Sequence, residues 1–150
     1  MKIPIKCSLM VNRLHAQFPK YQTPGSVGMD LYAAVDETVV IPPFERVKIP
    51  TGLVFEIPLG FEAQVRPRSG LSFEKGVLVV TGTIDQDFRG EVQVLIINLD
   101  PDEPFHVVPG ARIAQIVFAP VVQAQLEPTP EGHLSPTMRG INGFGSSGLF

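Results

Sequence analysis

The 150-residue sequence contains a single cysteine, Cys7. One cysteine excludes an internal disulfide and a pair of thiolate metal ligands, so we interpret Cys7 as a small apolar side chain. No stretch approaches the 18 apolar residues of a membrane-spanning helix, and the first residues lack the uninterrupted apolar run of a signal peptide. We therefore expect a cytoplasmic protein with no membrane partner.

Basic residues are also few and scattered. The chain has 12 Lys and Arg against 15 Asp and Glu. This balance excludes a broad nucleic-acid-binding surface, although a few arginines could converge on a small anion. The three histidines form no cluster, and we interpret them as surface or structural residues.

Long stretches without proline or glycine are missing as well; the longest runs from Ile5 to Phe18. Because an internal proline costs a helix about 3 kcal/mol, long helices are excluded. Apolar and polar residues alternate over 3–11 and 53–57, which predicts half-buried strands. Residues 92–99 and 113–122 are almost continuously apolar, and we expect strands covered on both faces there. This pattern predicts one all-β domain, a sandwich or barrel.

One short helix is expected at LSFEK, residues 71–75, with Ser69 as its N-cap and Gly76 closing it in the left-handed conformation. Arg66 and Arg68 lie on one face of the extended segment that leads into it. Free backbone N–H groups, a hydroxyl and two guanidinium groups together form a candidate anion site. An ordinary N-cap serine is the alternative explanation.

Isolated carboxylates stand out in two segments. Asp30 is the only charge in GSVGMDLYAA, residues 25–34, and faces either a site or its own turn. Asp85 and Asp87 share one face of an extended segment. A carboxylate near a bound phosphate could deprotonate a water, an effect worth about 10²–10⁴-fold in rate. The pair could instead bind a metal or line a solvated strand edge.

Arg112 and Gln115 are the polar exceptions in the apolar run RIAQIVFAP. A buried arginine is costly unless it is paired. We therefore expect Arg112 to meet a carboxylate or a ligand, and taken alone it favours a structural ion pair.

The chain ends in RGINGFGSSGLF, residues 139–150, which is too rich in glycine to build a core. Its glycines allow close approach to a ligand, while Arg139 can bind phosphate and Phe144 offers a face to a nucleobase. Ser146 and Ser147 can donate hydrogen bonds. A disordered terminus is the alternative, but it does not require an aromatic side chain between glycines.

Five segments occur in a fixed order: GSVGMDLYAA, RPRSGLSFEKG, GTIDQDFRGEV, RIAQIVFAP and RGINGFGSSG. This set resembles the five motifs of the trimeric deoxyuridine triphosphatases, hydrolases of nucleotide metabolism that cleave dUTP to dUMP and pyrophosphate. The resemblance implies a jelly-roll β-sandwich, a homotrimer with sites at subunit interfaces, and exchange of C-terminal arms. It implies a β domain over 1–138 and an arm over 139–150. Whether the arm serves its own or a neighbouring subunit stays open.

The resemblance also implies roles for single residues. Asp85 would activate the attacking water at the α-phosphorus, and Asp30 would hold Mg²⁺ through bound waters while the triphosphate chelates it. The remaining positions would bind substrate: Arg68, Ser69, Gly70 and Gln115 at the phosphates; Val79, Thr83, Ile84 and Phe88 at the base and sugar; Arg139, Phe144, Gly145, Ser146 and Ser147 in the arm.

The sequence departs from the family pattern at two of these positions. Phe88 stands where tyrosine is usual, and Val79 stands where many bacterial members carry asparagine. Both changes concern base and sugar, so we expect them to bear on selectivity and not on water activation. The backbone would then carry most of the uracil recognition.

Two other functions are compatible with the same fold. Deoxycytidine triphosphate deaminases need a glutamate at the pyrimidine C4, and no motif here resembles that arrangement. A non-catalytic trimeric module that binds a nucleotide or a protein partner would lack Asp85 or the arm, and both are present. The expected partners are therefore dUTP and further copies of the chain.

Overall fold

The computed structural model describes residues 2–143, so Phe144, Gly145, Ser146 and Ser147 lie outside the described residues. The described chain forms strands and a short helix, and the prediction of an all-β fold with one short helix is confirmed. The elements are β1 (Lys6–Leu9), β2 (Met29–Tyr32), β3 (Val39–Ile41), β4 (Arg46–Glu56), β5 (Phe61–Arg66), α1 (Ser69–Lys75), β6 (Val77–Val79), β7 (Gly82–Ile84), β8 (Val92–Asn98), β9 (Phe105–Val107) and β10 (Arg112–Pro120).

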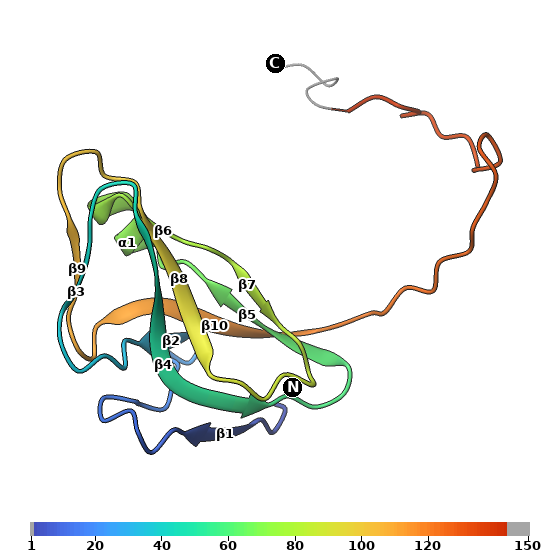
Figure 1. The fold of residues 1–150 in the computed structure, drawn as a ribbon. Coiled ribbons are helices and arrows are strands. Elements are labelled where there is room, and N and C mark those ends of the chain that lie inside the picture. Colours follow the sequence, from blue (N-terminus) through green and yellow to red (C-terminus); the bar gives the residue numbers. More distant parts are fainter. Residues whose placement is uncertain (1, 144–150) are drawn as a thin grey trace.

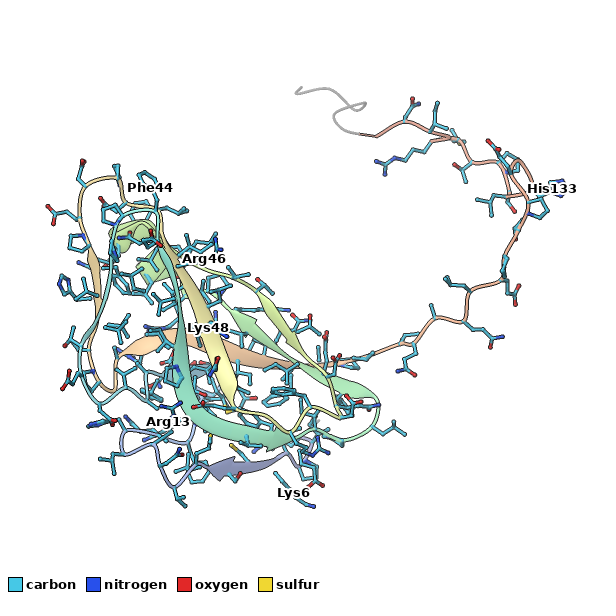
Figure 2. The ribbon with its side chains drawn as sticks, in the orientation of Figure 1. Lys6, Arg13, Phe44, Arg46, Lys48 and His133 are labelled. Atoms are coloured by element: carbon cyan, nitrogen blue, oxygen red, sulfur yellow. The ribbon has the colours of Figure 1, made fainter. Side chains whose placement is uncertain are left out.

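Two antiparallel four-stranded sheets make up the body, in the orders β1-β4-β8-β6 and β2-β10-β5-β7, and β3 pairs with β9 beside them (Figure 1). One hydrophobic cluster joins the sheets, with Val94 and Ile96 from β8 and Ala63, Val65 and Ile116 from β5 and β10. Side chains fill the space between the strands (Figure 2). The sandwich therefore has a single core.

The two apolar runs differ from what their composition predicts. β10 is buried on both faces at Ile113, Ala114, Ile116 and Val117, but the coverage expected as far as residue 122 is not reached, since the strand ends at Pro120 and Val122 is 94% exposed. In β8, however, only every second residue is buried, and Gln93 is exposed. Full coverage of β8 is therefore wrong for the single chain, because Leu95 and Ile97 on its outer face are only partly covered.

Helix α1 begins earlier than predicted, at Ser69 instead of Leu71. The chain stays extended at Arg68, with φ −99° and ψ 130°, so Arg68 is the N-cap and no side chain caps the helix. Ser69 is the first helical residue, and its assignment as N-cap is wrong. Gly76 closes the helix with φ +61°, as predicted.

After β10 the chain leaves the body. The Val121 N–H donates to the Gly60 carbonyl at 2.9 Å, and every residue from 121 to 143 is exposed. Figure 1 shows this segment sweeping away from the sheets, and Figure 2 shows His133 standing clear of them. Within residues 2–143, no helix combines the length and apolar character needed to cross a membrane.

Candidate active site

Asp30 is the centre of a charged cluster at one end of the second sheet. Its residue exposure is 7%, and it lies opposite Gln115 in the β2–β10 ladder. Arg68 places Nε 3.0 Å from Oδ1, and Arg112 places Nη1 3.5 Å from Oδ2. A buried carboxylate is stable only with such partners. The structural ion pair expected for Arg112 is confirmed.

Gln115 ties this cluster to the segment before α1. Its side-chain amide donates to the Pro67 carbonyl at 2.9 Å. A Cβ at Gly28 would lie 2.2 Å from the Gln115 Oε1 and 3.2 Å from its Cβ, so a side chain there would force the Gln115 side chain to move. The segments of Gly28, Arg68 and Gln115, far apart in sequence, therefore meet here.

An open hollow of about 400 Å³ lies beside the cluster, lined by Arg68, Ser69, Gly70 and Gln115 among others. The four residues outside the arm that were predicted to meet phosphates thus border one space. Arg66 does not join them, because its guanidinium donates to the Gln64 Oε1 at 2.6 and 2.9 Å.

Asp85 lies in the exposed turn that joins β7 to β8. The Phe88 N–H donates to the Asp85 carbonyl at 3.1 Å, and the Arg89 Nη1 donates to the carbonyls of Gln86 and Phe88 at 2.7 and 2.9 Å. The turn is thereby closed by its own backbone and one side chain. The Asp85 carboxylate is left accessible to a ligand.

Two hollows border this turn. The smaller, about 210 Å³, is lined by Thr83, Ile84, Asp85 and Phe88 among others, so four predicted site residues share it. The larger, about 670 Å³, is also lined by Asp85 and Thr83 and reaches the root of the C-terminal segment. Asp85 therefore borders both open spaces.

The side chains of Phe88 and Val79 differ in how far they are exposed to a ligand. Phe88 is 44% exposed, and its ring lies so close to Gly90 that a Cβ there would be 2.5 Å from the Phe88 Cζ. Val79 is 1% exposed and belongs to the core. Only the backbone of Val79 is available for recognition, whereas the ring of Phe88 is partly open.

The two groups of site residues lie apart in one chain. Asp85 follows Ile84, which pairs with Ala63 near the start of β5. Gln115 pairs with Arg66 at the end of the same strand. The four residue steps from Glu62 to Arg66 span about 13 Å of strand. Arg139 joins neither group, since its Nε donates to the Asn142 carbonyl at 2.9 Å within the exposed C-terminal segment.

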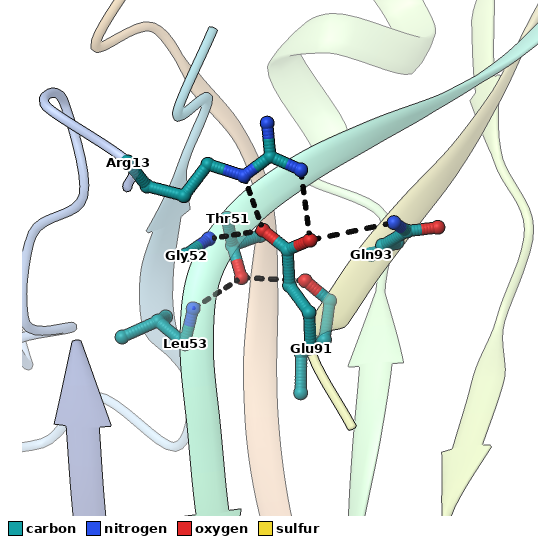
Figure 3. A network of polar contacts seen from close by, with 7 residues as sticks. Arg13, Thr51, Gly52, Leu53, Glu91 and Gln93 are labelled. Carbon is teal, nitrogen blue, oxygen red and sulfur yellow. Dashed lines mark hydrogen bonds and ion pairs between the residues drawn. The ribbon is translucent and has the colours of Figure 1, made fainter. Parts of the chain in front are cut away.

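A further polar network was not anticipated from the sequence (Figure 3). Glu91 accepts from the Arg13 Nε and Nη2, both at 3.1 Å, and from the Gly52 N–H at 2.9 Å. Burial acts to raise the pKa of Glu91, but the bonds from Arg13, Gly52 and Gln93 outweigh it, and the pKa lies below its ordinary value. The sequence signal was a lone carboxylate before an apolar strand; its partner lies 78 positions away.

Comparison with known proteins gives a consistent result. The family model for dUTPase matches residues 15–148. Deoxyuridine 5'-triphosphate nucleotidohydrolase from Brucella melitensis biotype 2 is 54% identical over 134 residues, covering 87% of this chain and 83% of the relative. The enzyme of the same name from Beijerinckia indica subsp. indica is 53% identical over 148 residues, covering 93% and 91%.

Solved structures agree with this result. A mutant Staphylococcus bacteriophage 80alpha dUTPase with dUpNHpp superposes with a TM-score of 0.86 at 26% identity, covering 99% of this chain and all of that one. A dUTPase of phage phi11 of S. aureus gives a TM-score of 0.77 at 23% identity, covering 87% and 99%. The jelly-roll fold expected from the motifs is therefore confirmed.

Proposed function

The chain belongs to the dUTPase family, and from this premise we propose that it hydrolyses dUTP by in-line attack of a water at sites assembled from several copies of the chain. As a family member it is a dUTP diphosphatase, and the products are dUMP and pyrophosphate. The observation that supports the proposal best is the exposed Asp85 carboxylate beside Phe88, in a hollow that Thr83 and Ile84 also line. We further propose that it acts in the cytoplasm, removing dUTP and supplying the dTMP precursor.

Asp85 would act as the general base. Its carboxylate orients a water against the α-phosphorus and takes one proton as the water oxygen bonds to phosphorus. The bond from that phosphorus to the bridging oxygen breaks, and pyrophosphate leaves on the opposite side. A positioned base of this kind is worth about 10²–10⁴-fold in rate.

The phosphates would be bound at the hollow beside α1. Arg68 supplies a guanidinium that the Asp30 Oδ1 holds at 3.0 Å, so its orientation is fixed before substrate arrives. Ser69 and Gly70 border the same hollow, and Gln115 fixes its floor through Pro67. These groups would neutralise and orient the chain of phosphates.

Magnesium fits this site through water. No three His, Cys, Asp or Glu side chains within residues 2–143 come together to hold a metal ion, and Asp30 already faces two guanidinium groups. Its buried Oδ2, however, makes no hydrogen bond to the described residues and could accept one from metal-bound water. When bound by the triphosphate, Mg²⁺ would neutralise charge on the leaving pyrophosphate.

Base and sugar would be recognised at the β7–β8 turn. The backbone of Val79, Thr83 and Ile84 would meet the uracil edge, and the Phe88 ring would pack on the deoxyribose and exclude a 2′-hydroxyl. Because the Val79 side chain is buried, it would not contact uracil, and main-chain groups would make the contacts to the base.

A homotrimer with exchanged arms accounts for the remaining features. Asp85 and the Arg68 cluster lie at opposite ends of β5, so a nucleotide would contact them on different copies of the chain. Arg139, Phe144, Gly145, Ser146 and Ser147 would close the site as an arm. The arm's beginning at residue 139 stays a prediction, whereas β10, the last strand of the described part of the chain, ends at Pro120.

The test is release of pyrophosphate from dUTP, dTTP, dCTP and UTP in parallel, with magnesium and then with a chelator. We expect turnover of dUTP alone and only with metal. Turnover of several nucleotides would mean that Phe88 and Val79 relax selectivity. Ammonia release from dCTP would favour a deaminase, and absence of any turnover would favour a binding module.

A further inference from the structure

The backbone ladder between β4 and β8 breaks at the base of the turn that carries Asp85. Pro50 pairs with Gln93 and Leu53 with Val92, so Thr51 and Gly52 form an insertion between neighbouring pairs. Side chains supply hydrogen bonds at this point. The Thr51 hydroxyl donates to the Val92 carbonyl at 2.6 Å, and the Gly52 N–H donates to the Glu91 carboxylate at 2.9 Å.

Arg13 completes this attachment from the N-terminal segment. It binds both carboxylate oxygens of Glu91 at 3.1 Å, and the Glu91 side chain is only 10% exposed. Gly52 has φ +68°, and a Cβ there would lie 2.4 Å from the Ala16 Cβ and 3.0 Å from the Arg13 Cβ. The N-terminal segment is therefore packed directly on the bulge, and Arg13 reaches Glu91 from a fixed position (Figure 3).

Glu91 is also close to the groups of the site. It follows Gly90, against which the Phe88 ring lies, and it lines the same hollow as Asp85 and Phe88. On the other side of the turn, β7 is held to β5 over only three residues. The position of the turn thus depends strongly on how its β8 end is attached.

We propose that Arg13 and Glu91 are a positioning pair, which fixes the β7–β8 turn so that Asp85 and Phe88 stand in register with the bound nucleotide. The proposal rests on the proposed function. A small displacement of a base from its reacting atoms costs as much as 10²-fold in rate. Loss of the pair should therefore reduce the rate of the chemical step even in a protein that remains folded.

The test uses the full chain with Arg13→Gln, Glu91→Gln, the double variant and the conservative Arg13→Lys. The matched control is Lys6→Gln, which removes the exposed 2.8 Å ion pair between Lys6 and Glu56 on β1 and β4. We expect each single variant to lower kcat for dUTP about tenfold. The double variant should be no slower than either single one, Arg13→Lys should recover part of the rate, and the control should stay within twofold of wild type.

Hydrogen exchange supplies a readout that does not depend on activity. Residues 84–90 should exchange faster in Arg13→Gln and Glu91→Gln than in wild type, and at the wild-type rate in Lys6→Gln. Unchanged kcat per folded chain, or losses that multiply in the double variant, would overturn the proposal. If wild type released no pyrophosphate, the proposed function would fail, and unchanged exchange at 84–90 would still reject the pair's role.

Discussion

The body of the protein and the segment after Pro120, described as far as residue 143, both contain apolar side chains but differ in how far these are buried. Within residues 2–143, all 22 buried apolar residues lie at or before Val117, while every residue from 121 to 143 is exposed. The segment is not short of apolar side chains: Val122, Leu126, Met138 and Ile141 are each at least 87% exposed. Its prolines and glycines prevent it from folding back as a strand or helix of its own.

This difference shows where each part obtains its order. In the body, sheet pairing and one core fix the backbone, so Asp85 and Arg68 are held before any ligand binds. Beyond Val121, residues 122–143 are exposed and contribute nothing to the core, so they would gain order from another surface, such as a neighbouring copy with nucleotide bound. The chemistry is therefore expected to depend on the body and site closure on the segment.

The sharpest test of that division is Asp85→Asn. We expect turnover to fall by about 10² or more while nucleotide binding is retained, because only the proton acceptor is removed. Pyrophosphate release and equilibrium binding of a non-hydrolysable dUTP analogue measure the two effects.

Asp87→Asn is the matched control, since Asp87 lies in the same turn but lines only the larger hollow. It should retain most of the wild-type rate. Equal losses in the two variants would mean that the turn as a whole, and not the Asp85 carboxylate, is what the reaction needs.

Removing residues 139–150 tests the other side of the comparison. We expect kcat/KM for dUTP to fall about tenfold or more, because the site is no longer closed over its ligand. The melting temperature of the body should not change, since residues 139–143 are exposed. Unaltered kinetics would contradict the closing role, and a large loss of stability would show that the segment is part of the resting assembly.

Much of the fold could be predicted because it depends on local pattern. The alternation at Leu53, Phe55 and Ile57 gives their burial directly, and Gly76 ends α1 as its position suggested. The outer face of β8 was misjudged because composition cannot tell which layer covers a strand. Ser69 was misplaced by one residue, since the extended backbone at Arg68 depends on how the chain enters the helix.

The motifs named the residues of the candidate site but not the contacts between them. Asp85, Phe88 and Thr83 line one hollow, and Arg68, Ser69 and Gln115 line another, while their roles stay predictions. The pairing of Asp30 with Arg68 was not foreseen, because it joins β2 to the segment before α1, which the sequence does not show to be neighbours. The Arg13–Glu91 pair was missed because its two residues lie outside the strands and 78 positions apart.

Gly28→Ala probes how rigid the phosphate end of the body must be. The new methyl group would collide with the Gln115 side chain and break its hydrogen bond to Pro67. A lost hydrogen bond is worth about 1 kcal/mol, which corresponds to a rise in KM for dUTP of about fivefold. Steady-state kinetics measure it, and Gly25→Ala, where a Cβ meets nothing within 4 Å, is the control.

The smallest expected effect is a pH dependence of body stability that Glu91 imposes. Its pKa in the folded chain lies below the ordinary value of 4.5, so its stabilising contribution is complete above that pH and is lost as pH falls through the folded pKa. Wild type and Glu91→Gln should therefore differ most in melting temperature near neutral pH and converge in acid. Other carboxylates with lowered pKa, such as Glu56 and Asp100, are common to both proteins and cancel in the difference. A gap that stays constant from pH 7 to about pH 3 would mean that the charge of Glu91 does not contribute, and that its attachment of the turn depends on shape and neutral hydrogen bonds alone.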